Sequence, residues 1–162
     1  MNAAELLDDL SVRIYEPPLA NLRDDGRILD TSNPLSVVML VIDYETECSM
    51  NGIIGYLGNS AGERITETIS ALRVIGCSAH ADKLTAIQVA ATNGGMTHAD
   101  IQTDREQVAP FAVTSFAELH GDKWDSTCDT INSIFDGIDC DELWPKMTEF
   151  IQAHMGEIEH QL

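Results

Sequence analysis

The chain has 162 residues, of which 44% are hydrophobic and 22% are charged, so its composition is that of one globular domain rather than of an acidic disordered tail. Asp and Glu outnumber Lys and Arg by 27 to 9, which gives a net charge of -18. A charge of this sign repels nucleic acid, anionic membranes and acidic substrates, and it attracts cations and basic protein surfaces. We therefore do not expect this protein to bind nucleic acid directly or to associate with a membrane.

Neither a membrane span nor a signal peptide is predicted. The longest apolar run, VVMLVI at residues 37–42, is far shorter than the roughly 20 residues that a spanning helix needs. The first residues, MNAAELLDD, lack both the basic n-region and the apolar h-region of a signal peptide. The four cysteines contain no CxxC pair. We therefore expect a cytoplasmic protein with reduced thiols.

Helical spacing of apolar residues begins near the N-terminus. Leucines at helical intervals predict a first helix over about residues 3–15, which Pro17-Pro18 ends. Residues 19–30 form a loop or a short helix. Ser32 or Asn33 can cap the next helix and Pro34 suits its first turn. Because its middle is apolar nearly all round, this segment is predicted to be the central buried helix.

The remaining helices follow the same period of 3.6 residues. Helices are predicted over residues 60–75, 79–92, 103–116, 121–135 and 141–155, with Pro110 as a break or kink in the third of them. No run alternates between apolar and polar residues over a useful length, so a sheet is not expected. The predicted fold is all-α, with residues 1–162 forming a single compact globular domain of roughly eight to ten helices.

Residues 118–142 concentrate the negative charge. This segment carries eight carboxylates and one cation, Lys123. On a helix that starts at Gly121, four aspartates fall within about 60° of one another, and four apolar residues fall in another sector of similar width. The first group is Asp122, Asp125, Asp129 and Asp136, and the second is Trp124, Cys128, Ile131 and Phe135. An ordinary solvated face would interleave charges of both signs, because like charges at this spacing destabilise a helix.

The residue spacings in the sequence match no known metal-binding or phosphate-binding motif. A calcium loop that starts at Asp125 would need glycine where Thr130 stands, and no other start in the segment fits. Cys77 and His80 have a zinc-like spacing but lack two further ligands, so we expect a buried thiol and a surface histidine. The glycine-rich run at 52–62 lacks the lysine of a phosphate loop, so its glycines are expected to serve turns and close helix packing. No catalytic residue, metal or cofactor is predicted.

A dense acidic surface can compete with DNA for a basic groove. Duplex DNA carries one charge per about 1.7 Å of axis, so the net charge of -18 equals roughly nine base pairs of phosphate. Residues 31–62 add three acids and no base, and we expect them to continue the acidic track. The predicted partner-binding residues are Asp122, Asp125, Asp129, Asp136, Asp139, Asp141, Glu142, Asp43, Glu45 and Glu47.

Residues 50–84 resemble the bacterial DNA mimic protein family. The pattern is an Asn-Gly start, an aromatic, an Asn-Ser pair, a Gly-acid pair and a helix that closes in Ile-Gly. Here these are Asn51-Gly52, Tyr56, Asn59-Ser60, Gly62-Glu63 and Ile75-Gly76. The resemblance implies an all-helical protein, able to form a homodimer, that inhibits a dimeric helix-turn-helix transcription factor by occupying its DNA-binding surface. Ile53 and Ile54 replace the glycine and aromatic expected after Asn-Gly, and the motif is interpreted as a structural cap-and-turn network.

Two other functions stay open at the level of sequence. An immunity or antitoxin-like protein that neutralises a basic nuclease would use the same electrostatics. An enzyme would use carboxylates together with the glycine-rich run at 52–62. Identification of the partner distinguishes the first alternative, and loss of a specific turnover in a folded Asn51 or Tyr56 variant would indicate the second.

Overall fold

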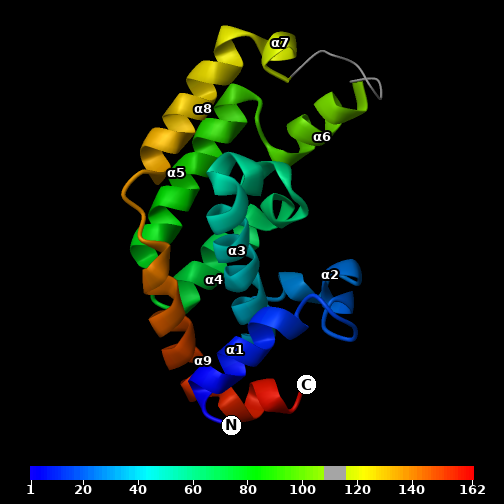
Figure 1. Ribbon diagram of the computed structural model, residues 1–162, viewed down its shortest axis with the longest axis vertical. Coiled ribbons are helices and arrows are strands. Elements are labelled where there is room, and N and C mark those ends of the chain that lie inside the picture. Colours follow the sequence, from blue (N-terminus) through cyan, green and yellow to red (C-terminus); the bar gives the residue numbers. More distant parts are fainter. Residues whose placement is uncertain (108–115) are drawn as a thin grey trace.

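The computed structural model describes residues 1–107 and 116–162 of the chain (Figure 1). Every regular element in these ranges is a helix, which confirms the all-α prediction. The elements are α1 (Ala3–Arg13), α2 (Asn21–Asp24), the 3-10 helix η1 (Arg27–Leu29), α3 (Pro34–Gly58), η2 (Ser60–Arg64), α4 (Ile65–Val74), α5 (Ser78–Gly94), α6 (His98–Gln107), α7 (Phe116–His120), α8 (Asp122–Phe135), η3 (Cys140–Glu142) and α9 (Leu143–Glu159).

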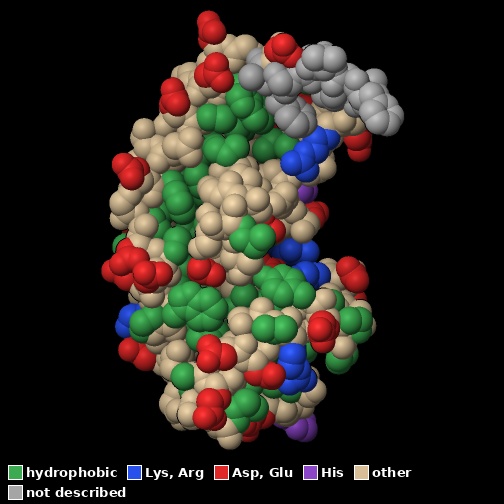
Figure 2. All heavy atoms as spheres, in the orientation of Figure 1, with side chains coloured by type: hydrophobic (Ala, Val, Ile, Leu, Met, Phe, Trp, Pro, Cys, Tyr) green, Lys and Arg blue, Asp and Glu red, His purple; other side chains and the backbone are tan. Residues whose placement is uncertain are grey.

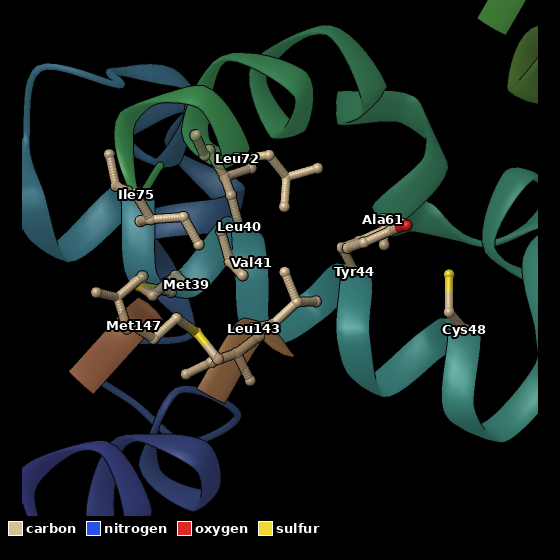
Figure 3. Packing of buried hydrophobic residues seen from close by; sticks show 14 of the residues in the cluster. Met39, Leu40, Val41, Tyr44, Cys48, Ala61, Leu72, Ile75, Leu143 and Met147 are labelled. Carbon is tan, nitrogen blue, oxygen red and sulfur yellow. The ribbon is translucent and has the colours of Figure 1, made fainter. Parts of the chain in front are cut away.

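Helix α3 is the centre of the core, as its apolar sequence predicts. It starts where the Asn33 side chain accepts a hydrogen bond from the Leu35 amide at 2.9 Å. Helices α4, α8 and α9 pack against it. Figure 3 shows Met39, Leu40 and Val41 of α3 beside labelled side chains from α4 and α9. Neighbouring helices cover α3 on several sides. This packing stabilises the helix despite the low helix propensity of its β-branched residues.

Two glycines of the recognised motif have structural roles. Gly52 interrupts the helical conformation within α3 with a φ of 67° and a ψ of 177°, a backbone region that side chains with a Cβ rarely enter. At Gly62, an added Cβ would lie 2.4 Å from the Tyr56 carbonyl oxygen, so the η2 turn can sit on the end of α3 only with glycine there. Ile53 is buried beside the break and adds to the core.

Helix boundaries differ from the prediction mainly around α6. The structure starts this helix at His98 rather than near Thr103. The Thr97 hydroxyl accepts from the Asp100 amide at 3.2 Å, and the Asp100 carboxylate accepts from the Thr97 amide at 3.0 Å. The sequence carries this capping box as T-x-x-D at residues 97–100. The predicted continuation beyond Gln107, with Pro110, lies outside the described residues.

The arrangement in space is elongated. Helices α8 and α9 follow each other along one edge, and α8 packs on α5 (Figure 1). Both termini lie at the end of the molecule occupied by α1 and α9. None of the described helices has the length and apolar character required to cross a membrane.

Candidate protein-binding surface

Helix α8 presents its apolar sector to the core and its acidic sector to solvent. Ile131 is fully buried, and Trp124, Cys128 and Phe135 are half-buried. The four aspartates of the other sector are all exposed. The structure therefore confirms the division of this helix into a packed side and a carboxylate side, because the same period that spaces the apolar residues spaces the acids.

We call the exposed acids of residues 122–142 the acidic ridge. Its members are Asp122, Asp125, Asp129, Asp136, Asp139, Asp141 and Glu142. In Figure 2, acidic side chains follow the left edge of the molecule over α8 and the link to α9. Within residues 1–107 and 116–162, no Lys or Arg forms an ion pair with a ridge carboxylate. The ridge charge is thus left for solvent or a partner.

Two side chains of α5 form hydrogen bonds to main-chain carbonyl oxygens of the acidic ridge. The Lys83 ammonium donates to the Asp136 carbonyl oxygen at 3.1 Å. His80 Nε2 lies 3.1 Å from the Asp139 carbonyl oxygen, and because a carbonyl can only accept, this nitrogen carries the proton. Both bonds end on main-chain atoms, so they hold the link between α8 and α9 without neutralising the aspartate side chains.

His80 corrects one expectation from the sequence. It was predicted to be a surface residue at the start of a helix, but it is only 4% exposed. The ring is covered by the 139–142 turn, with Glu142 Oε2 3.9 Å from Nε2. Burial lowers the pKa of His80, and the hydrogen bond to Asp139 and the Glu142 carboxylate partly oppose this shift.

Acidification should therefore destabilise the protein at His80. The folded-state pKa lies below the unfolded value of about 6.5, so the unfolded chain binds the proton first and stability falls as the pH drops through about 6.5. We expect the fall in thermal midpoint between pH 7 and pH 5.5 to be smaller in His80→Gln than in the parent. His160→Gln, at an exposed site near the C-terminus, is the matched control. Equal pH dependence of parent and His80→Gln would contradict the assignment.

The three acids of α3 do not act together, which corrects the predicted surface. Asp43 is 7% exposed and forms a bidentate pair with Arg23, with Nε–Oδ2 and Nη2–Oδ1 distances of 3.0 and 2.6 Å. Glu47 Oε2 accepts from the side-chain amides of Asn51 at 3.0 Å and Asn59 at 2.6 Å. Asp43 and Glu47 therefore do not extend the acidic ridge.

Glu45 lies on the other side of α3 from these two residues. At 100° per residue it is about 200° from Asp43, whereas Asp43 and Glu47 are only about 40° apart. Burial raises the pKa of the Cys140 thiol, and the negative charge of Glu45 raises it further, which places Glu45 near the η3 end of the ridge. Of the three predicted α3 residues, Glu45 is the one that the fold brings toward the ridge.

The described part of the chain holds no cluster of side chains suited to binding a metal ion, and the Cys77 thiol is not activated as a nucleophile. No three His, Cys, Asp or Glu side chains in residues 1–107 and 116–162 converge in a way that could hold a metal ion. Cys77 is buried, as predicted, and burial raises the pKa of its thiol. A protonated thiol is a weak nucleophile and a poor ligand.

Comparison with known families places the chain. Residues 30–154 match the DMP19-like protein family. The chain belongs to this family. The matched residues run from before α3 into α9, so they include both the core helix and the whole acidic ridge. Comparison with curated proteins and with solved structures finds no match.

The sequence did not predict the long-range contacts that bury Asp43 and that hold the turn between α8 and α9. The Arg23–Asp43 pair joins residues 20 positions apart, and the bonds from His80 and Lys83 join residues more than 50 positions apart. No local pattern signals such contacts. The one usable hint was the isolated charge of Asp43 in the apolar middle of α3, since a charge at such a position usually requires a partner.

Proposed function

We propose that this protein is a DNA mimic, a non-enzymatic competitive inhibitor that occupies the DNA-binding surface of a basic DNA-binding protein. The proposed partner is a dimeric helix-turn-helix transcription factor, whose repression would be relieved, and the proposed form of the mimic includes a homodimer. The observation that carries this proposal is the acidic ridge, in which seven exposed carboxylates lack an ion-pairing Lys or Arg among the described residues.

The spacing along α8 supports the proposal. With a rise of 1.5 Å per residue, Asp122 and Asp125 are separated by about 4.5 Å along the axis, and Asp125 and Asp129 by about 6 Å. One strand of duplex DNA advances about 3.4 Å per phosphate. The charges of the ridge are therefore spaced more widely than the phosphates of a DNA strand, but by less than a factor of two. A groove lined by Arg and Lys is complementary to both.

The rigidity of the ridge also supports competition with DNA. Its carboxylates are carried by a packed helix and by a turn that His80 and Lys83 hold through the main chain. A preordered surface loses less conformational entropy on binding than an acidic tail does. Clustered like charges destabilise the free protein slightly, and a basic partner would relieve that repulsion.

Affinity capture followed by DNA competition tests the proposal. The protein is immobilised and exposed to lysate of its source cells at about 50 mM salt, where surface electrostatics are weakly screened. We expect capture of a DNA-binding protein that is released by its own duplex operator and by salt. A captured protein that binds DNA and this chain simultaneously would contradict mimicry. Capture of a nuclease whose activity this chain blocks would instead indicate an immunity or antitoxin-like function.

A further inference from the structure

A cavity of about 380 Å³ lies on the side of α3 away from the acidic ridge. Its walls come from α2, α3 and η2 and from Tyr15, which follows α1. Figure 1 places α2 and α8 on opposite sides of α3, and Figure 2 shows the molecule hollowed at its right edge above α2. The volume falls in the range of pockets that bind small molecules.

The cavity is lined by a buried ion pair. Arg23 donates two hydrogen bonds to Asp43 and one to the Ile14 carbonyl oxygen, and its guanidinium lies 5.2 Å from the centre of the Tyr15 ring. The two charged side chains are only 15% and 9% exposed. Removing two charges from water is costly, so an apolar pair of similar volume would often be at least as stable. A charged lining is instead what a polar ligand requires.

A second carboxylate, Glu47, is held in a fixed orientation at the same cavity. The amides of Asn51 and Asn59 both donate to its Oε2 atom, and no described residue donates to Oε1. These asparagines belong to the motif at 51–62, which the acidic ridge does not use. Fixing a carboxylate through one oxygen leaves the other to accept a hydrogen bond from a bound group.

The charge of the lining selects the ligand. Arg23 is the one cation among the lining residues, and Asp24, Asp43 and Glu47 are carboxylates, so the cavity has an excess of negative charge. Burial raises the pKa of Tyr15. The Asp43 and Glu47 charges add to this rise, and a hydrogen bond with Thr46 and the Arg23 charge oppose it. A bound group should therefore be positive, donate hydrogen bonds to carboxylates and tolerate contact with an aromatic ring.

We propose that this cavity binds an alkyl-ammonium or alkyl-guanidinium group, with Glu47 Oε1 and Asp24 as its acceptors and the Tyr15 side chain beside it. The Arg23–Asp43 pair forms the wall and fixes the position of the Tyr15 ring. This site is separate from the acidic ridge, so the proposal does not depend on DNA mimicry.

Calorimetric titration with agmatine, which carries both cationic groups, tests the site at 150 mM NaCl. The parent should bind it with one saturable site, and Glu47→Gln should bind at least about tenfold more weakly, because a charge-assisted hydrogen bond is lost. Glu45→Gln removes the same charge two residues earlier on the opposite side of α3 and should bind like the parent. Equal losses in both variants, or no saturable binding by the parent, would overturn the proposal.

Two further measurements keep the test independent of folding and of diffuse attraction. Asp24→Asn changes an exposed lining residue and should weaken agmatine several-fold with unchanged helicity. Amide spectra should shift at Ser60 and Ala61 and not at Asp125, whereas shifts spread over the acidic ridge would overturn the site. A blocked peptide, acetyl-Ala-Arg-Ala-amide, identifies the source: its binding indicates a protein side chain, and its exclusion beside agmatine binding indicates a free small molecule.

Discussion

Replacing Asp125 and Asp129 by lysine should weaken partner binding by at least about 100-fold without unfolding the protein. Each change turns an attraction to a basic groove into a repulsion, and like charges juxtaposed across an interface cost several kcal/mol. Both aspartates are exposed, and lysine favours a helix more than aspartate does, so α8 should persist. Affinity for the captured partner at 50 mM NaCl measures the effect, with circular dichroism to confirm helicity.

A variant with the same change in net charge provides the control. Helix α1, which contains Asp8, lies at the end of the molecule away from α8 (Figure 1). Glu16 follows that helix in the sequence, and both residues are exposed. Asp8→Lys with Glu16→Lys should bind almost as tightly as the parent. An equal loss in this control would show that total charge governs binding. Parent-like affinity of the Asp125→Lys and Asp129→Lys variant would exclude α8 as the interface.

Replacing Arg23 by alanine should destabilise the fold by about 3 kcal/mol or more. Removal of one partner from a buried ion pair leaves the other charge buried without compensation, and this typically costs about 3–5 kcal/mol. Here Asp43 would remain inside with two hydrogen bonds lost. For a chain of this length the thermal midpoint should fall by about 6–12 °C. Urea unfolding followed by circular dichroism gives the free energy of unfolding directly.

The Arg13–Asp9 pair is the matched comparison for Arg23. It is an i,i+4 pair on α1 with side chains 39% and 38% exposed, so Arg13→Ala should cost no more than about 0.5 kcal/mol. Joint replacement of Arg23 by Met and Asp43 by Leu should recover much of the loss, because no uncompensated charge remains. If Arg23→Ala and Arg13→Ala lose the same stability, the Arg23–Asp43 pair is solvated in solution.

Much of the fold followed from local pattern. The 3.6-residue period predicted most of the helices, Ser32 or Asn33 followed by Pro34 predicted the start of α3, and the angular spacing of acids and apolar residues predicted the two sides of α8. These features succeed because each is decided within one or two helical turns. The all-helical class follows from the same cause, since no segment offers the alternation that a half-buried strand requires.

The tertiary structure decided which acids share a surface. Sequence spacing determines the angle between Asp43, Glu45 and Glu47 around the axis of α3, but it does not determine which neighbour covers each side. Because α3 is apolar nearly all round, its pattern names no solvent-facing side. Packing then placed Asp43 against Arg23, Glu47 beside the cavity and Glu45 near Cys140. The sequence by itself thus determined most of the helices and the acidic side of α8, whereas the start of α6, the burial of Asp43 and His80 and the cavity beside Glu47 were decided by the tertiary structure.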